Sequence, residues 1–257
     1  MSRIRIIRDQ DFAPGPAETS TEKWPRRVID VDDRITITEA CNKAGAISAW
    51  HHHGQNTTCV YVLRGSVRVE WGPDGRETAD VDAGDFYFIS PNAIHRESNP
   101  GSDDQMLIAF IAGERPKFIN VDESEPERRA GQEEGGIRVI RTRDLKDGPG
   151  SRGMMRRLAD VDKGLSLAEA RNEPQTFSGW HHHGEGTTCV YLAQGNTRLE
   201  WGAGGRESAD LSAGDCYVIY PHAIHREGNP GPGPQLIVGF YLGEGSRVVN
   251  VDAPGAQ

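Results

Sequence analysis

The sequence contains one long pattern twice. The segment SAWHHHGQNTTCVYVLRG at 48–65 returns as SGWHHHGEGTTCVYLAQG at 178–195, an offset of 130 residues (178 − 48 = 130). Upstream, RRVIDVDDRITITEA at 26–40 matches RRLADVDKGLSLAEA at 156–170 with the same offset. Repetition over such a length indicates that one folding unit is present twice. The chain is therefore expected to form two similar domains.

The stretch between the two copies is typical of a linker. Residues 122–136, DESEPERRAGQEEGG, are rich in charge, Pro and Gly and carry almost no apolar side chains. We therefore expect an N-terminal domain at 1–125, a linker at 126–136 and a C-terminal domain at 137–257. A chain of 257 residues is long enough to bury a core in each of the two domains.

Each half carries the pattern of a β structure. Runs such as 59–63, 67–71 and 86–89 are short, rich in Val, Tyr, Ile and Trp, and bounded by Gly, Pro, Asp and Asn. Helical periodicity is weak almost everywhere. Regular short strands separated by turns, in a unit of about 120 residues, predict a sandwich or a barrel in each half.

Charge and composition narrow the partners of the chain. Asp and Glu outnumber Lys and Arg by 38 to 29, and the net charge of −9 disfavours binding to nucleic acid. No window approaches the length of a membrane span and the N-terminus lacks an apolar signal region, so we expect a cytoplasmic protein without a membrane partner. The four cysteines form no CxxC pair, which is typical of reduced and buried thiols.

The runs of three histidines predict metal sites when a later histidine is added in each half. Because side chains alternate along a strand, the first and third histidines of a run share one face and the middle one takes the other. The segments GDFYFISPNAIHRESNP at 84–100 and GDCYVIYPHAIHREGNP at 214–230 each deliver one more histidine after a turn and a strand. Three converging imidazoles with open positions are typical of a catalytic metal site. The expected ligands are His51, His53 and His95, and in the second half His181, His183 and His225.

These residues carry a resemblance to the cupin superfamily. Their spacing is similar to the two cupin motifs, G-x5-H-x-H-x3,4-E-x6-G and G-x5-P-x-G-x2-H-x3-N. Gly45, Gly65, Gly84 and Asn99 fall in register around the first set of histidines, and the second half matches except that Gln175 replaces the leading glycine. The resemblance implies an all-β fold of two tandem double-stranded β-helix, or jelly-roll, cupin barrels. The whole chain thus resembles a bicupin.

The sequence departs from the cupin motif at the glutamate that follows the histidine pair, where it has Thr58 and Thr188. Three neutral donors then remain around a divalent cation. This is similar to the three-histidine cupins, among them thiol, β-diketone and gentisate-type dioxygenases, which use Fe(II) to bind a substrate and O₂ together. The resemblance therefore implies a divalent transition metal, with Fe(II) favoured, although imidazole ligands also suit zinc, nickel or manganese.

Two further pairs of residues are candidate catalytic groups. Thr58 and Thr188 take the inward position of the missing glutamate, where a hydroxyl can orient a water or a substrate oxygen, or where a β-branched residue simply fits a strand. Glu97 and Glu227 lie two residues after the last histidine, on its face of a continuing strand. They are candidates for a general base or for a hydrogen-bond acceptor beside the metal, the alternative being a salt bridge with an arginine such as Arg96.

Three classes of function remain open. The favoured one is a non-haem Fe(II) dioxygenase that acts with O₂ on a small aromatic or dicarbonyl compound. The second is a redox-neutral isomerase, hydrolase or polyketide-cyclase-like bicupin with the cation as Lewis acid, and the third is a non-enzymatic small-molecule-binding bicupin. Both triads are complete, so two metals per chain are expected. Because two fused cupins mimic the common cupin dimer, we expect a monomer or a homodimer.

Overall fold

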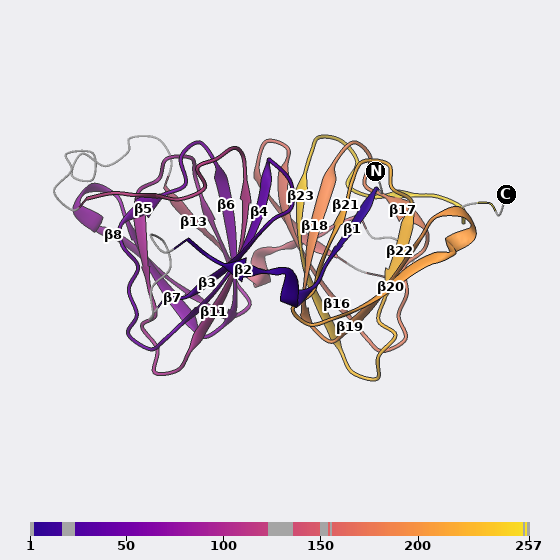
Figure 1. Cartoon of the computed structure of the whole chain (residues 1–257), viewed down its shortest axis with the longest axis horizontal. Helices are drawn as coiled ribbons and strands as arrows, with labels where there is room; N and C mark the ends of the chain where they lie inside the picture. Colours follow the sequence, from indigo (N-terminus) through magenta and orange to yellow (C-terminus); the bar gives the residue numbers. More distant parts are fainter. Residues whose placement is uncertain are drawn as a thin grey trace. The chain divides into compact units, whose positions relative to one another are not determined.

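The computed structural model describes residues 3–16, 24–122, 136–149, 154, 156–253 and 255. Within these ranges the regular elements are 24 β-strands and four 3-10 helices of three residues each (Figure 1). All the strand pairs that join neighbours within the sheets are antiparallel. The prediction of an all-β fold is confirmed.

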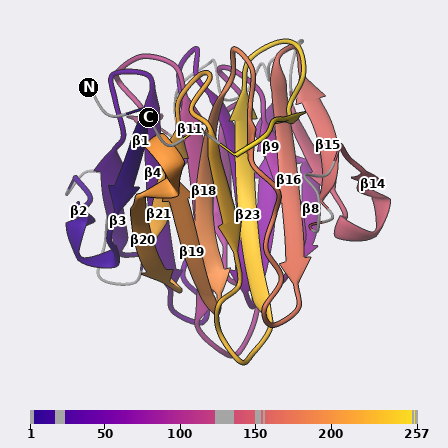
Figure 2. The ribbon, with the colours of Figure 1, turned by 90° about the vertical axis from the view of Figure 1, so that its right-hand side faces the viewer.

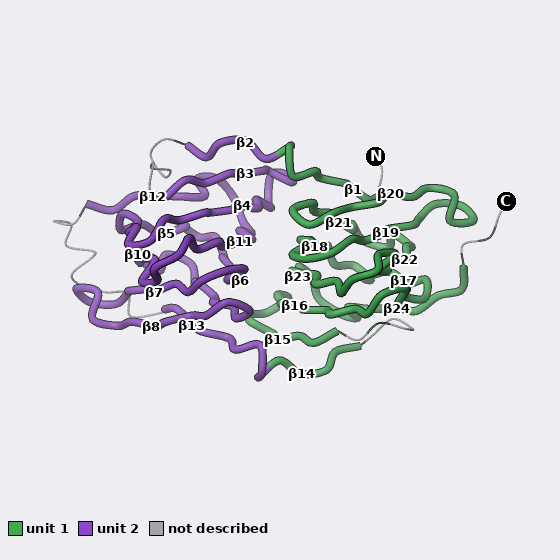
Figure 3. Tube along the Cα trace, turned by 90° about the horizontal axis from the view of Figure 1, so that it is seen from below, with its two compact units in different colours: residues 1–11, 145–257 green, residues 12–144 purple. Residues whose placement is uncertain are grey.

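The chain divides into two compact units, which Figure 3 draws in different colours. The first, here called the N-terminal unit, is Phe12–Asp144 and is purple in that figure. The second, the C-terminal unit, combines Met1–Asp11 with Leu145–Gln257 and is green. Each unit contains one copy of the repeated sequence.

Each unit also takes a short strand from beyond its own copy. Strand β1 (Ile4–Ile7) pairs with β21 (Cys216–Ile219) in the C-terminal unit, and β13 (Ile137–Ile140) pairs with β9 (Phe86–Ile89) in the N-terminal unit. These units differ from the expected division at 126–136, because the two strands are exchanged between the halves of the sequence. Residues 126–135 of the expected linker lie outside the described residues.

In its described residues the N-terminal unit has two sheets, in the orders β13-β9-β6-β11-β4-β3-β2 and β12-β5-β10-β7-β8. Neighbours that are distant in sequence, such as β4 beside β11, are typical of a jelly roll. Besides β9 and β13, the elements are β2 (Ala13–Pro14), β3 (Arg26–Asp30), β4 (Ile35–Asn42), β5 (His51–His52), β6 (Thr57–Arg64), β7 (Ser66–Trp71), η2 (Pro73–Gly75), β8 (Glu77–Asp82), β10 (His95–Ser98), β11 (Gln105–Ala112), β12 (Ile119–Asn120) and η3 (Thr142–Asp144).

The C-terminal unit repeats this order in its described part, as β1-β21-β18-β23-β16-β15-β14 and β20-β19-β22-β17-β24. Figure 2 shows β18, β23 and β16 of the larger sheet side by side. Besides β1 and β21, the elements are η1 (Asp9–Asp11), β14 (Lys146–Asp147), β15 (Arg157–Asp162), β16 (Leu165–Asn172), β17 (His181–His182), β18 (Thr187–Gln194), β19 (Asn196–Trp201), η4 (Ala203–Gly205), β20 (Glu207–Ser212), β22 (His225–Gly228), β23 (Gln235–Leu242) and β24 (Val249–Asn250).

The core of each barrel is built from the inward side chains of both sheets. In β7, Val67 and Val69 are fully buried while Arg68 between them is exposed, as expected for a strand with one face toward the core. Val81 of β8 and Ile89 of β9 belong to the same cluster. Equivalent residues, among them Leu199, Leu211 and Ile219, fill the core of the C-terminal unit.

The cysteines follow the prediction of reduced thiols. All four are free, and Cys59, Cys189 and Cys216 are buried. None of the helices in the described part of the chain has the length and apolar character needed to span a membrane.

Candidate metal centres

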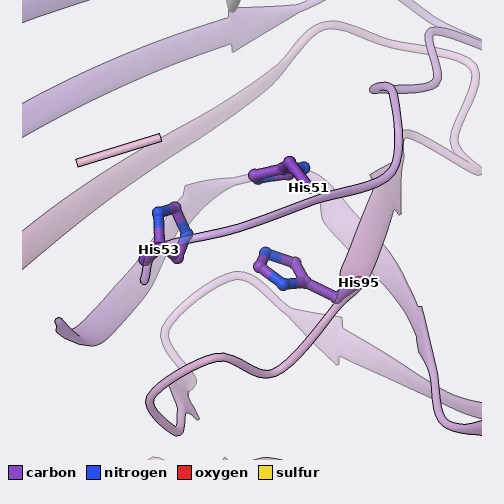
Figure 4. Close-up of side chains that lie close together, drawn as sticks. All are labelled: His51, His53 and His95. Atoms are coloured by element: carbon purple, nitrogen blue, oxygen red, sulfur yellow. The ribbon is translucent and has the colours of Figure 1, made fainter. Parts of the chain in front are cut away.

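In the N-terminal unit, strand pairing brings three histidines together. His51 of β5 lies directly opposite His95 of β10, and His53 follows just after the end of β5. All three are almost fully buried, whereas His52 between them is half-buried, as the alternation along a strand predicts. Figure 4 shows the rings of His51, His53 and His95 pointing toward one another. One nitrogen of each ring lies within 4.8 Å of the others.

The C-terminal unit repeats this group. His181 of β17 lies opposite His225 of β22, and His183 follows. All three are buried, and their ring nitrogens again lie within 4.8 Å of one another. The centroids of the two opposed rings are 4.3 Å apart in both units. The structure therefore brings all six expected ligands together, as two separate groups of three.

Backbone carbonyls fix the orientation of every one of these rings. In the N-terminal unit, Nδ1 of His51, His53 and His95 lies 2.8 to 2.9 Å from a carbonyl oxygen. Because a carbonyl only accepts, Nδ1 carries the hydrogen and Nε2 keeps its lone pair. Metal-binding histidines are commonly oriented in this way. The carbonyls are those of Ala49, Lys117 and Ala93, and in the C-terminal unit Gly179, Arg247 and Ala223.

The inward nitrogens fit a divalent cation. Among the residues that the structure describes, Nε2 of His95 and of His225 is buried and has no hydrogen-bond partner. Burial lowers the pKa of His181 to about 2 and that of His183 to about 3. The nearby His225 and Arg156 act in the same direction. These imidazoles are neutral at pH 7, and neutral nitrogen donors in threes suit zinc, iron, manganese or nickel.

A buried ion pair lies beside the C-terminal histidines. Arg156 donates from Nη2 to Glu227 Oε1 over 2.5 Å, and the same nitrogen is 3.3 Å from Nε2 of His181. The hydroxyl of Tyr217 donates to the other carboxylate oxygen of Glu227. Burial alone would raise the pKa of Glu227, but the positive charge of Arg156, helped by the hydrogen bond from Tyr217, lowers it to about 2.

The N-terminal unit holds the same three residue types at the same offset. Glu97 is buried and accepts a hydrogen bond from the hydroxyl of Tyr87. Arg26 is also buried and lines the same small cavity inside the barrel as Glu97. The neighbouring Arg96 instead pairs with Glu70, at 2.7 Å. The expected alternative for the glutamates, a salt bridge to arginine, is therefore realised for Glu227 by an arginine from a different part of the chain.

Sequence reasoning overlooked these arginines and tyrosines. Arg26 and Arg156 open the repeated RR segments, and Tyr87 and Tyr217 lie in the repeated strands before the last histidine. The sequence shows that these residues are identical in the two copies. Identity between the copies does not distinguish a residue at the site from one that a duplication merely copied.

The two candidate threonines also face the sites. Thr58 of β6 and Thr188 of β18 are buried, and within the described ranges their Oγ1 atoms have no hydrogen-bond partner. Each lines the same cavity as the histidines of its unit. A free hydroxyl in such a cavity is available to a bound ligand. A catalytic role for the threonines and glutamates remains a prediction.

Each triad adjoins a small cavity inside its barrel. The volume is about 30 Å³ in the N-terminal unit and about 50 Å³ in the C-terminal unit. Both have room for only a few non-hydrogen atoms. Their polar linings include Arg26, His51, His53, Thr58 and Glu97 in the first, and Arg156, His183, Thr188 and Glu227 in the second.

Comparison with known proteins agrees with this architecture. Residues 40–111 match the cupin domain family. The whole fold is similar to oxalate decarboxylase from Bacillus subtilis, with a TM-score of 0.77 at 17% identity, over 96% of this chain and 78% of that one. The chain has the fold of a bicupin. Its two triads fit the two metal sites of such a fold.

Other solved structures share the bicupin fold. The formate complex of oxalate decarboxylase from Lactobacillus farciminis has a TM-score of 0.74 at 15% identity, covering 96% of this chain and 88% of that one. A further Bacillus subtilis structure, from work on its Mn(II) centres, has a TM-score of 0.72 at 16% identity, covering 96% and 79%. At these identities the likeness establishes the fold. A search of curated protein sequences gave no match.

Proposed function

We propose that this bicupin is a metal-dependent enzyme that acts on a small carboxylic acid. The observation that carries the proposal is the buried guanidinium of Arg156, 3.3 Å from His181 and paired with Glu227. A divalent cation on three neutral imidazoles, together with Arg156, outweighs the single negative charge of Glu227. Excess positive charge in a buried cavity is costly unless an anion joins it.

A carboxylate is the anion that suits this site best. A guanidinium presents its N–H donors in a planar fork that matches a carboxylate, and Arg156 already pairs with one in Glu227. The cavity of about 50 Å³ limits the ligand to a few atoms. The similar structures include a decarboxylase with formate bound, which supports a small carboxylate in a barrel of this kind.

The chain's own groups divide the chemistry as follows. A divalent cation supplies a Lewis acid that polarises oxygens of the substrate when it is bound. Arg156 orients the carboxylate, and Glu227, ionised at neutral pH, accepts a proton at the oxygen nearest the substrate. Burial and the charge of Glu227 raise the pKa of Tyr217 well above its ordinary value, so this hydroxyl stays protonated and holds Glu227 in place. These roles support redox-neutral proton transfer or decarboxylation.

A second candidate is the Fe(II) dioxygenase of a small aromatic or dicarbonyl compound, with O₂ as co-substrate. It is favoured by the donor sets, since the three-histidine groups found among the described residues contain no carboxylate. Glu97 and Glu227 are engaged by tyrosine hydroxyls. Cavities of about 30 and 50 Å³ favour a small dicarbonyl over an aromatic ring.

The proposal is tested on protein purified without added metal and then loaded with Mn(II) or, anaerobically, with Fe(II). Elemental analysis gives the metal content. Carbon dioxide release and O₂ uptake are followed with 2-oxo acids, dicarboxylic acids, β-diketones, gentisate-like acids and thiols. Turnover of a carboxylic acid without stoichiometric O₂ uptake supports redox-neutral chemistry, whereas one O₂ consumed per turnover establishes the dioxygenase.

A pair of arginine variants ties the activity to the site. Arg156→Met should keep its metal and lose turnover of carboxylic acids by at least about 100-fold, because the charge that orients the substrate is gone. Arg157→Met is the matched control, since Arg157 is the next residue but pairs with Glu169 on the larger sheet. Equal activity of the two variants would refute the assignment of Arg156.

A further inference from the structure

The linings of the two cavities share one histidine, the glutamate and the arginine at equivalent positions, but they differ at other positions. Four residues that line the N-terminal cavity have smaller counterparts 130 positions later in the sequence. These are Trp24, Thr38, Ala109 and Phe118, whose counterparts are Met154, Ala168, Gly239 and Val248. The cavity of the C-terminal unit is the larger of the two, at about 50 against 30 Å³.

Phe118 lies beside two of the three N-terminal histidines. The centroid of its ring is 5.1 Å from that of His53 and 6.4 Å from that of His51. The guanidinium of Arg26 lies over the same ring, 5.1 Å from its centroid. Phe118 therefore occupies space next to two ligands and next to the buried arginine. A substrate carbon chain bound between the cation and Arg26 would meet this ring.

The backbone holds the counterpart of Phe118 in the same place. Phe118 follows Lys117, whose carbonyl accepts the hydrogen of His53 Nδ1. Val248 follows Arg247, whose carbonyl accepts the hydrogen of His183 Nδ1 over 2.6 Å. The position of this residue relative to a ligand histidine is thus the same in both units. Valine has no ring, so the space above His183 is freed.

A cross-strand pair widens the opposite wall. Thr38 of β4 faces Ala109 of β11, whereas Ala168 of β16 faces Gly239 of β23. Both members of the pair are smaller in the C-terminal unit, and the hydroxyl of Thr38 is lost. Apolar residues, among them Leu158, Ile237 and Phe240, line the rest of the C-terminal cavity.

Three substitutions run the other way, since Leu158, Tyr241 and Arg247 of the C-terminal lining replace Val28, Ile111 and Lys117. The ring of Tyr241 lies against Gly186, where a Cβ would collide with it. Gly186 itself replaces Asn56. The added volume of the tyrosine is therefore matched by the loss of a side chain beside it.

From these walls we infer that the C-terminal site binds the substrate, a small monocarboxylate or 2-oxo acid with a short apolar chain. The N-terminal site, narrowed by Phe118, takes only ligands of the size of formate or water. This inference rests on the proposed function, since it assumes that both triads bind metal and that the sites bind carboxylates. Phe118 and Val248 determine the size of the ligand that each site admits.

The test compares formate with butanoate at each site in turn. The double variant His51→Ala/His53→Ala leaves the C-terminal site, and His181→Ala/His183→Ala leaves the N-terminal site. Each is loaded with Co(II), and the visible spectrum is followed during titration with either acid. Each buried methylene is worth about fourfold in affinity, so butanoate should bind the C-terminal site about 10-fold or more tighter than the N-terminal site. Formate should bind both within about threefold.

Exchange of the two wall residues should reverse the preference. Phe118→Val should strengthen butanoate binding at the N-terminal site by about 10-fold, and Val248→Phe should weaken it at the C-terminal site by a similar factor, with formate little changed. Ile119→Val and Val249→Ile are the matched controls, because these next residues do not line either cavity. If a double-alanine variant does not fold, Phe118→Val and Val248→Phe are titrated with butanoate while both sites are present. The protein without wall changes should then show two binding phases, and each wall variant should show one.

The outcomes separate this inference from the proposed function. Equal butanoate affinities at the two sites, or a Phe118→Val variant that binds butanoate no better, would overturn the inference while formate binding leaves the proposed function intact. If neither formate nor butanoate binds at either site, both the inference and the proposed function are refuted. Butanoate bound tightly at the C-terminal site alone, with the reversal above, supports both.

Discussion

The N-terminal and C-terminal sites agree in the atoms that face a cation and differ in the side chains that surround it. In both units the rings are held by carbonyls at equivalent positions, for example those of Lys117 and Arg247. Next to these carbonyls stand Phe118 in one unit and Val248 in the other. Because the backbone orients the imidazoles, the neighbouring side chains can change without moving them. In such a fold, metal binding and ligand size can therefore be altered independently.

Removal of one ligand should have the largest effect. His95→Ala and His225→Ala should each lower the metal content from two equivalents to one, with affinity at the altered site down by more than about 100-fold. Elemental analysis after dialysis against buffered Mn(II) measures this. His52→Ala is the control, because His52 is half-buried and accepts a hydrogen bond from the Gly54 amide. Two equivalents in either ligand variant would contradict the two-site assignment.

Acid should destabilise both units of the metal-free protein alike. Burial lowers the pKa of His181 to about 2 and of His183 to about 3, while an unfolded histidine has a pKa of about 6.5. As the pH falls below 6.5, only the unfolded chain gains protons, so the free energy of unfolding decreases until the pH reaches the folded pKa. One pH unit below 6.5, His181 and His183 each cost about 1.4 kcal/mol, or about 3 kcal/mol together.

Urea unfolding of the metal-free protein at pH 7.5 and 5.5 measures this loss. Replacing His181 and His183 together with glutamine should reduce the difference between the two pH values by about 3 kcal/mol. Replacing His51 and His53 together with glutamine should also reduce the difference, since burial lowers the pKa of both well below the ordinary value. A pH dependence that neither variant reduces would show that the triads are charged or exposed.

The histidine triads could be predicted from sequence because their signal is local. His51 and His53 share a face by strand alternation alone, and only the pairing of His51 with His95 needed the fold. Arg26 could not be placed in this way. It comes from β3 of the larger sheet, while Glu97 comes from β10 of the smaller one, and no spacing along the chain reports which side chains meet between two sheets.

The exchange of the end strands β1 and β13 between the units could not be predicted from the sequence either. IRIIR at 4–8 and IRVIR at 137–141 are nearly identical, and their partner strands FYFI and CYVI are similar apolar strands that share Tyr and Ile at equivalent positions. Either end strand can complete either sheet edge with similar contacts. Local pattern therefore predicts that both strands form, and only the path of the chain decides which edge each one covers.

Replacing the glutamates should separate the two sites by activity. Glu227→Gln should lower kcat by at least about 100-fold, because a positioned general base contributes that much or more. Glu97→Gln should cause a smaller loss, since the N-terminal site does not admit the substrate. Steady-state kinetics with metal content measured in parallel tests this, with Glu70→Gln, which alters the pair with Arg96, as control. Equal losses in the two variants would show that both sites turn over substrate.

Removing the tyrosine hydroxyls should have the smallest effect and should be equal in the two units. Tyr87 and Tyr217 each donate to a buried carboxylate, and burial together with that carboxylate raises both pKa values well above the ordinary one. Loss of a hydrogen bond to a charged group costs about 1.5 to 3 kcal/mol, so Tyr87→Phe and Tyr217→Phe should each lower the free energy of unfolding by that amount.

Urea unfolding at pH 7 and pH 8.5 compares the two tyrosine variants, each serving as the control for the other. The loss should be the same at both pH values, because neither hydroxyl ionises in this range. Unequal losses would mean that the two units differ in the hydrogen bond from tyrosine to glutamate, as well as in the walls of their cavities. Equal losses would show that the hydrogen bond to the glutamate has the same strength in both units. The difference between the two sites would then lie in the walls of their cavities, where selection for a different substrate size would act after a duplication.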